Sequence, residues 1–453
     1  MRIGFQTLGC KLNQYETEAL ASSFRGQGHV IVSENEEAEA YIINTCTVTG
    51  RADHKSRAAV RSLSKKHPHS LLIVTGCSAQ LEAEILASVA DNVLVVPQSA
   101  KGELLALAEK VTQANDIPTG LAQLRHGSIR ASPDPFAFRV KELSFHTRAF
   151  LKVQDGCDAM CAYCRVPQAR GSSQSLDADE VVRRATELES LGHREIVITG
   201  VNISSYRFRD VHLPRLIREV IEATQNVRFR LSSLEPECLT EDLAASLSHD
   251  RVCAHFHLPV QSGSDGVLAR MRRRYRAAQV VEGVKLLRAA KADPFVAADF
   301  IVGFPGETSQ EHSSTVELVE KVAFAALHVF PFSPRPGTVA AKLRPPVPQR
   351  VRDERARELG GISRRLLCDY AQSWSGKDVD VLIEAGTSSA SRQATVARGV
   401  TGNYLKVLID DVPLDANLRG KVVRARVTQS GEVCRAVLVG SPTFSGKATP
   451  GEL

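Results

Sequence analysis

Short apolar runs alternate with segments of helical spacing along the first part of the chain. Three of these runs are brief and rich in β-branched residues: Ile3 to Thr7, Ala40 to Asn44 and Leu71 to Thr75. Helical spacing begins after each run, near Asn13, Arg51 and Ala79. Such alternation is typical of a parallel sheet with helices on its faces. We therefore expect residues 1–110 to form an α/β domain around a parallel sheet.

The same alternation resumes after a connector at residues 111–148, which contains three prolines and several Ser and Gly residues. Six further strands are expected between residues 149 and 335, near Phe150, Ile196, Phe229, His255, Phe300 and Val329. Right-handed crossovers would curl such strand–helix units into a full or a partial barrel. With six units, we favour a partial (β/α)6 barrel.

Helix signals are clearest in the first crossover of this region. One helical face carries four apolar residues: Val181, Ala185, Leu188 and Leu191. Asp177 with Glu180 predicts a capping box at the start of the helix, and Gly192 predicts its end. A second helix is expected over residues 213–224.

The last quarter of the chain has a different pattern. An Arg-rich helix is expected within residues 336–373, and residues 374–441 carry short Val-rich runs separated by Gly, Asp and Asn. Short runs with turn residues between them predict a small antiparallel β-barrel. Residues 442–453 are expected to form a tail.

Composition and charge narrow the class of protein. A chain of 453 residues is too long for a single core and predicts several domains. Because 43% of the residues are hydrophobic and 24% are charged, these domains are expected to be folded. No apolar run reaches the length of a membrane-spanning helix and no signal peptide is visible, so we expect a cytoplasmic protein with no membrane partner. The net charge of +6 suits RNA and is equally compatible with a solvated surface. Arg-rich segments at residues 270–276 and 344–365 are candidate phosphate contacts, with solvated helix faces as the alternative.

Ten cysteines in a cytoplasmic chain favour metal binding or catalysis over disulfides. Cys157, Cys161 and Cys164 follow a predicted strand with the spacing C-x-x-x-C-x-x-C. A structural zinc ion takes four ligands, and no histidine lies within this segment. Three cysteines around a four-iron cluster leave one iron open to chelate a small molecule, and S-adenosylmethionine (SAM) fits that position. The alternatives are a zinc site or incidental buried thiols.

Cys10, Cys46 and Cys77 are far apart in sequence but share a setting, because each lies one to three residues after a predicted strand. Parallel strand ends meet at one edge of a sheet, so these thiols can converge and hold a second cluster. Helix N-termini begin nearby and would favour the thiolate form. Inert core thiols are the alternative. The remaining cysteines show no grouping and are expected to be structural: Cys238, Cys253, Cys368 and Cys434.

Together these motifs resemble the radical SAM methylthiotransferase family. The resemblance rests on the second triplet and on Thr7-Leu8-Gly9-Cys10, Asn44-Thr45-Cys46 and Thr75-Gly76-Cys77, and it covers nearly the whole chain. It implies two [4Fe-4S] clusters, SAM, a C-terminal RNA-binding barrel of the TRAM type, and insertion of a methylthio group at a C–H carbon of a modified adenosine in tRNA. It also implies an electron donor such as flavodoxin or ferredoxin, and a sulfur donor.

Further segments resemble the SAM pocket of this family, since they follow strands and carry Gly, Ser, Gln and carboxylate residues. The residues expected to contact SAM are Gly200, Ser232, Glu235, Gln261 and Asp299. One departure from the family follows Arg170-Gly171, where this chain has Ser172-Ser173-Gln174 in place of the usual basic residues. No role is predicted for that segment.

The sequence around Cys10 resembles the branch of the family that modifies N6-threonylcarbamoyladenosine. Lys11 and Glu16 distinguish it from the isopentenyladenosine branch, in which Gln-Met-Asn commonly follows the cysteine and Asp replaces the glutamate. A threonylcarbamoyl group ends in a carboxylate that a basic pocket could pair, whereas an isopentenyl group needs an apolar pocket. The alternatives are isopentenyladenosine in tRNA, an aspartate of a ribosomal protein and, in a different class, a non-catalytic iron–sulfur protein that binds RNA or carries electrons.

Overall fold

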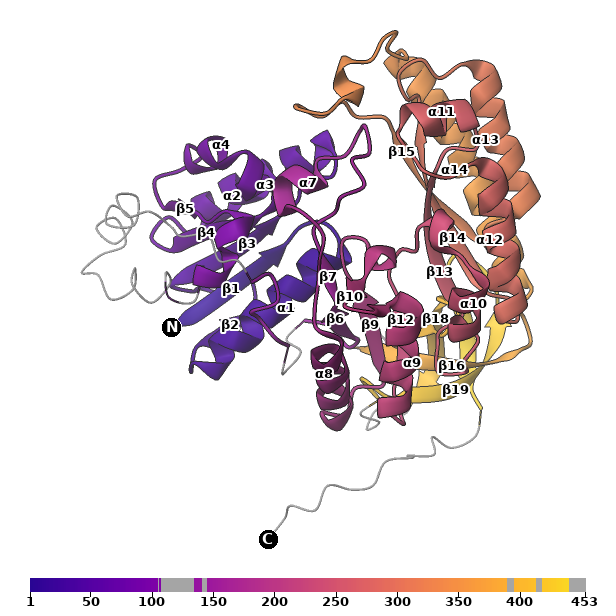
Figure 1. Ribbon diagram of the computed structural model, residues 1–453. Coiled ribbons are helices and arrows are strands. Elements are labelled where there is room, and N and C mark those ends of the chain that lie inside the picture. Colours follow the sequence, from indigo (N-terminus) through magenta and orange to yellow (C-terminus); the bar gives the residue numbers. More distant parts are fainter. Residues whose placement is uncertain (105, 107–133, 141–144, 389–394, 413–417, 440–453) are drawn as a thin grey trace.

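The computed structural model describes residues 1–104, 106, 134–140, 145–388, 395–412 and 418–439 (Figure 1). Most of the predicted connector and the whole predicted tail lie outside these residues. Figure 1 shows the N-terminal part of the chain beside a central part, with a C-terminal barrel below the central part. None of the described helices combines the length and the apolar character needed to cross a lipid bilayer.

The N-terminal part is a five-stranded parallel sheet between two helical layers, with the strand order β2-β1-β3-β4-β5. The strands are β1 (Arg2–Thr7), β2 (Val30–Val32), β3 (Ala40–Thr45), β4 (Leu71–Gly76) and β5 (Val93–Val95). The helices are α1 (Lys11–Gly26), α2 (Gly50–Lys66), α3 (Cys77–Leu81), α4 (Ala83–Ala87) and the 3-10 helix η1 (Gln98–Glu103). Side chains of α1 and η1 bury one face of the sheet, and those of α2, α3 and α4 bury the other. The predicted parallel sheet is confirmed.

The central part contains the six strands that the sequence predicts: β6 (Ala149–Lys152), β9 (Glu195–Thr199), β12 (Arg228–Leu231), β13 (His255–Gln261), β14 (Phe295–Val302) and β15 (Ala326–Pro331). They form two parallel sheets, β12-β9-β6 and β13-β14-β15. A parallel bridge joins Ser233, two residues after β12, to His257 of β13, and another joins Phe229 of β12 to Val252, three residues before β13. The outer helices are α8 (Ala178–Ser190), α9 (Leu213–Ala223), α10 (Glu241–Leu247), α12 (Ala277–Ala290) and α13 (Ser309–Val322). The partial barrel is therefore confirmed.

The helix α8 differs from its prediction in two details. Asp177 caps the helix with its carboxylate, but Glu180 does not complete a capping box. The carboxylate of Glu180 binds Arg183 and Arg184 instead, because these cations lie one turn further along the helix. Leu191 is 49% exposed, so the buried stripe ends before it.

The N-terminal part covers the open side of the partial barrel. Leu12, Tyr15 and Ala19 of α1 pack against Phe150 of β6 and Val197 of β9. The sequence neighbours of these two strand residues belong to the outer core, and alternate strand residues face opposite sides, so both point into the barrel. The first turn of α1 therefore lies against the barrel interior.

A closed five-stranded barrel follows the long helix α14 (Gln349–Gln372). Its strands are β16 (Asp378–Ser388), β17 (Thr395–Thr401), β18 (Lys406–Val412), β19 (Val422–Gln429) and β20 (Cys434–Leu438). Four of the strand pairings are antiparallel, and the pairing of β18 with β20 is parallel. The predicted barrel is confirmed, and it includes one parallel pair that the prediction lacked.

This barrel docks at the amino-terminal end of the central strands. Arg230 of β12 donates hydrogen bonds to the backbone carbonyls of Thr401 and Gly402, both at 3.0 Å. The ring of Tyr404 stacks on His255, the first residue of β13, with ring centres 4.1 Å apart. The barrel thus closes the floor of the central part, at the opposite end from the loop that follows β6.

Candidate active site

The loop that follows β6 and the short strand β7 (Gln154–Asp155) holds Cys157, Cys161 and Cys164. Each sulfur has a nearby N–H donor. Backbone N–H groups two residues further along lie 3.4 Å from the Sγ atoms of Cys157 and Cys164. Arg273 Nη1 lies 3.3 Å from Cys161 Sγ. Because such donors stabilise negative charge on sulfur, the loop is suited to hold thiolates around a metal centre.

The segment at Ser172 and Ser173 packs against the start of the cysteine loop. Gly156 permits this close approach. The φ of Gly156 is +69°, and a Cβ there would lie 1.9 Å from the carbonyl oxygen of Ser172. Ser173 donates from its backbone N–H to Asp158 at 3.2 Å, and its hydroxyl accepts from Gln154 Nε2 at 3.0 Å. The segment that departs from the family pattern therefore contributes to the support of the cysteine loop.

Cys10, Cys46 and Cys77 lie at the carboxyl ends of the neighbouring strands β1, β3 and β4. Gly9 shows how closely these ends approach, because its φ is +105° and a Cβ there would lie 2.7 Å from Cys46 Sγ. Gly76 has a φ of +98°, and a Cβ there would lie 2.4 Å from a backbone oxygen of β3. The two glycines thus permit the contacts that bring these three cysteines to one edge of the sheet.

Burial raises the pKa values of four of these six thiols. It raises the pKa of Cys46 and that of Cys164 to about 12 each, and it raises those of Cys77 and Cys157 as well. For Cys46 and Cys77, where nearby helix N-termini were expected to favour the thiolate, loss of solvation is the larger effect on the pKa. Thiolates at these positions need a bound metal to stabilise them.

The spacing of the sulfur atoms separates a zinc site from a larger cluster. Thiolates around one zinc ion, at bond lengths of about 2.3 Å, lie about 3.8 Å from one another. In the part of the chain that the structure describes, neither triad brings its three sulfurs within 4.8 Å of one another. Neither triad therefore has the close spacing of three thiolates around one zinc ion.

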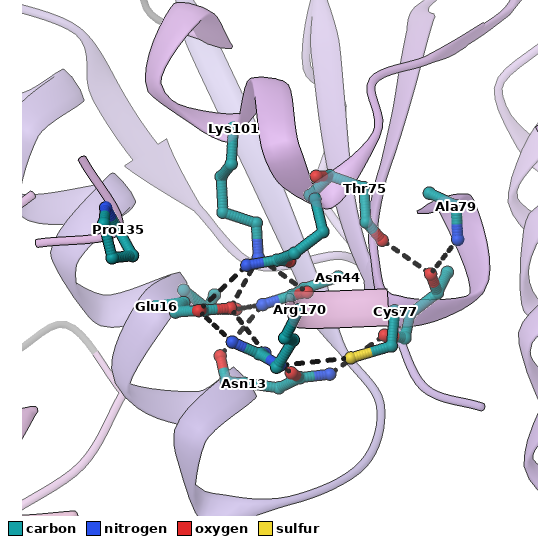
Figure 2. A network of polar contacts seen from close by, with 12 residues as sticks. Asn13, Glu16, Asn44, Thr75, Cys77, Ala79, Lys101, Pro135 and Arg170 are labelled. Carbon is teal, nitrogen blue, oxygen red and sulfur yellow. Dashed lines mark hydrogen bonds and ion pairs between the residues drawn. The ribbon is translucent and has the colours of Figure 1, made fainter. Parts of the chain in front are cut away.

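Arg170, in the short helix α7 (Val166–Arg170), connects the neighbourhoods of the two triads, and Figure 2 shows its guanidinium beside Cys77 and Glu16. Its Nε lies 3.3 Å from Cys77 Sγ in the N-terminal part. Its Nη1 binds Glu16 of α1 at 2.8 Å and Asp155, directly before the cysteine loop, at 3.1 Å. One guanidinium therefore contacts the second triad and the base of the first.

Lys101 and Lys152 complete the network by binding Glu16, at 2.5 and 3.2 Å. The five charged side chains of the network are at most 7% exposed. Burial raises the pKa of Glu16, but Arg170 and the two lysines outweigh it and hold the pKa well below its usual value. Three cations face two carboxylates, so the network leaves a net positive charge beside Cys77.

A cavity of about 470 Å³ opens beside the cysteine loop. It is lined by Cys161, Glu235 and Arg273, together with Asn202 and several serines. Burial raises the pKa of Glu235 to about 7, although Arg273 binds its carboxylate. The cavity offers a carboxyl group, a guanidinium and hydroxyls next to Cys161, which are suited to an amino-acid-like ligand with a ribose.

Of the five residues predicted to contact SAM, only Glu235 lines this cavity. A Cβ on Gly200 would lie 2.8 Å from a backbone oxygen of β7, so this glycine permits close packing of two strands. Ser232 and Gln261 are buried, with 8% and 7% of their surface exposed. Asp299 lies 2.9 Å from a ring nitrogen of His257. A SAM contact by any of these residues stays a prediction.

Several arginines predicted as phosphate contacts have partners inside the protein. Arg273 binds Cys161 and Glu235, Arg270 binds Glu311 at 2.8 Å, and Arg355 binds Glu307 at 2.6 Å. The exposed arginines of the first segment, which stay candidates for phosphate contact, are Arg272, Arg274 and Arg276. Sequence reasoning missed the roles of Arg170 and Arg273 because the cysteines that they contact lie 93 and 112 residues away in the chain.

Comparison with known proteins matches two regions of the chain. Residues 2–97 match the model of the uncharacterized protein family UPF0004, and residues 151–319 match that of the radical SAM superfamily. The threonylcarbamoyladenosine tRNA methylthiotransferase MtaB of Treponema pallidum is 35% identical, covering 95% of this chain and 99% of that protein. The protein of the same name from Bacillus subtilis is 33% identical, covering 95% of this chain and 94% of its own.

A solved structure supports the fold. The radical S-adenosylmethionine methyltransferase TsrM of Kitasatospora setae superposes with a TM-score of 0.54, covering 75% of this chain and 73% of its own. At 13% identity, this likeness concerns the arrangement of elements alone.

Proposed function

Because this chain belongs to the family of threonylcarbamoyladenosine tRNA methylthiotransferases, we propose that it converts N6-threonylcarbamoyladenosine in tRNA to the 2-methylthio derivative by radical SAM chemistry. The observation that carries this proposal is the joining of two cysteine triads through Arg170, whose Nε lies 3.3 Å from Cys77 Sγ. A methylthiotransferase has two tasks, to activate a C–H bond and to deliver sulfur. Two adjacent metal-binding triads suit that division.

In this proposal Cys157, Cys161 and Cys164 hold the cluster that binds SAM, and this group supplies, when bound, the electron that cleaves the sulfonium. The protein residues position the ligand. Arg273 binds both Cys161 and Glu235, so it fixes one wall of the 470 Å³ cavity against the cysteine loop. We propose that SAM occupies this cavity, and that Glu235 contacts its amino-acid portion.

We further propose that Cys10, Cys46 and Cys77 would hold a second four-iron cluster, which would supply the sulfur to be inserted. Arg170 donates to Cys77 and keeps a net positive charge at this triad. An electron donor such as flavodoxin or ferredoxin and a separate sulfur donor complete the reaction. A tRNA substrate supports a cytoplasmic location for the protein.

An assay with purified protein tests the proposal. Protein reconstituted without oxygen should hold about eight irons per chain, since two four-iron clusters are expected. With SAM, a reductant and a sulfide source, it should methylthiolate an anticodon stem-loop RNA that carries threonylcarbamoyladenosine. Cys368→Ser serves as the control for cysteine replacements in the triads. Because this exposed cysteine lies outside both triads, the variant should keep the iron content and the product of the wild type. Product from isopentenyladenosine RNA alone would support the other tRNA branch, and SAM cleavage without either product would contradict the tRNA assignment.

A further inference from the structure

Asp299, one of the residues predicted to contact SAM, lies outside the cavity beside Cys161 and belongs to a polar group on the inner face of the partial barrel. Asp299 of β14 and His328 of β15 are direct neighbours in the strand register. His257 of β13 lies 2.9 Å from Asp299 through Nε2 and 2.7 Å from the hydroxyl of Ser233 through Nδ1. The side chains of His257 and Asp299 are 16% and 24% exposed, and His328 is exposed, so a ligand can reach this group.

Lys11 approaches the same face from the N-terminal part. Its Nζ lies 5.8 Å from the centre of the Tyr404 ring, which it shares with Arg148 and Arg230. Tyr404 stacks on His255, which lies two residues before His257 on β13 and therefore faces the same side of the sheet. Lys11 directly follows Cys10, so it joins the second triad to the barrel interior.

Lys11 differs from the two arginines in its partners. Arg148 binds Glu384 at 2.9 Å, and Arg230 binds Glu195 at 2.6 Å. None of the ion pairs among the described residues includes Lys11, so no carboxylate oxygen of these residues lies within 4.0 Å of its Nζ. A half-buried ammonium group without a carboxylate partner is suited to bind an anionic group of a ligand.

We propose that Lys11, Asp299 and His328 recognise the threonylcarbamoyl group of the substrate nucleoside. Lys11 pairs with its carboxylate, and Asp299 with His328 binds its hydroxyl. This inference rests on the proposed function and names the residues that select the substrate. An isopentenyl group has neither a carboxylate nor a hydroxyl, so it would leave these polar groups without partners, which disfavours its binding. Because Lys11 adjoins Cys10, a substrate held in this way keeps its adenine close to the second triad.

A metal ion is the alternative occupant of this group, since ligand atoms of His257, Asp299 and His328 lie within 4.8 Å of one another. Both ring nitrogens of His257 have partners, Ser233 and Asp299, so metal binding would require Nε2 to exchange its contact with Asp299 for the ion. Metal analysis is therefore part of the test.

The test compares two substrates that differ in one charge. Stem-loop RNAs carry either threonylcarbamoyladenosine or its neutral carboxamide. For the wild type, kcat/KM should be about 10- to 100-fold higher with the acid, because a charge-assisted hydrogen bond contributes about 1.5–3 kcal/mol. Lys11→Met should remove most of this preference, mainly by raising KM for the acid, and Lys11→Arg should retain part of it. Lys285→Met on the exposed face of α12 is the control and should keep the full preference.

A second comparison tests the hydroxyl. Asp299→Asn should lower kcat/KM for the threonylcarbamoyl RNA by several fold more than for a glycylcarbamoyl RNA, which has the carboxylate without the hydroxyl. Iron content, measured on every variant, checks that both triads remain folded.

Each contrary result has a distinct meaning. If Lys11→Met lowers activity on acid and amide equally, or if the wild type does not distinguish them, the recognition role is refuted while the proposed function stands. If the wild type cleaves SAM but methylthiolates neither RNA, the proposed function itself fails. A stoichiometric metal other than iron that is lost in His328→Ala would overturn the assignment of His328 and Asp299 to the substrate.

Discussion

Replacing Arg170 by Met removes the guanidinium that joins the N-terminal part to the central part. The side chain is 3% exposed and binds Cys77, Glu16 and Asn13 on one side and Asp155 on the other. Loss of one partner from a buried ion pair typically costs about 3–5 kcal/mol, because the remaining charges keep their desolvation penalty. Lys101 and Lys152 still neutralise the two carboxylates, so we expect a cost near the lower end, about 3 kcal/mol.

Hydrogen exchange measured by mass spectrometry shows which segments of the protein are destabilised by this substitution. A loss of about 3 kcal/mol in the local opening free energy corresponds to roughly 100-fold faster exchange. We expect this acceleration in peptides that cover the first turns of α1 and the helix α7, with little change in the C-terminal barrel. Arg183→Met is the matched control, because the Arg183 side chain on α8 is 47% exposed and its ion pairs contribute at most about 1 kcal/mol. Equal exchange in the two variants would refute the assignment of Arg170 as the link.

Three further predictions concern the triads and pH. Joint replacement of Cys157, Cys161 and Cys164 by Ala should halve the iron content and abolish reductive cleavage of SAM, and full cleavage would contradict the radical assignment. Joint replacement of Cys10, Cys46 and Cys77 should also halve the iron content and eliminate the methylthio product while SAM cleavage continues, and normal product would contradict the two-cluster proposal. Burial and Arg230 hold the pKa of His255 well below 6.5, so below pH 6.5 the unfolded chain binds a proton that the folded chain does not. Stability should therefore fall with decreasing pH, by up to about 1.4 kcal/mol per pH unit from this group. His255→Phe should flatten that part of the slope in denaturation followed by fluorescence of the single tryptophan, Trp374, and an unchanged slope would contradict the role of His255.

The long strands and helices could be predicted from the sequence because their apolar spacing is local. The six strands of the partial barrel and the first three strands recognised in the N-terminal sheet all appear near their predicted positions. The strands β2 and β5 were not predicted, since each has only three residues and shows no alternation long enough to detect. The parallel pairing of β18 with β20 depends on how the barrel closes, which local patterns do not encode.

The cysteines could be placed from sequence because the ends of parallel strands meet at one edge. The polar groups around them could not, since their partners are distant in the chain. Glu16 and Arg170 are 154 residues apart, and His257 and Asp299 are 42 residues apart on strands that only the barrel brings together. Glu16 distinguishes one family branch in sequence, yet its carboxylate binds Arg170 and two lysines. Of the two branch-distinguishing residues, Lys11 is the one that we place at the substrate.

Mass spectrometry of tRNA nucleosides from a host with and without this gene tests the central claim most directly. Deletion should eliminate 2-methylthio-N6-threonylcarbamoyladenosine, let unmethylthiolated threonylcarbamoyladenosine accumulate, and leave 2-methylthio-isopentenyladenosine unchanged. A plasmid copy should restore the missing nucleoside, and a copy with Cys157, Cys161 and Cys164 replaced by Ala should not. Loss of the isopentenyl derivative alone, or no change in either methylthio nucleoside, would contradict the account.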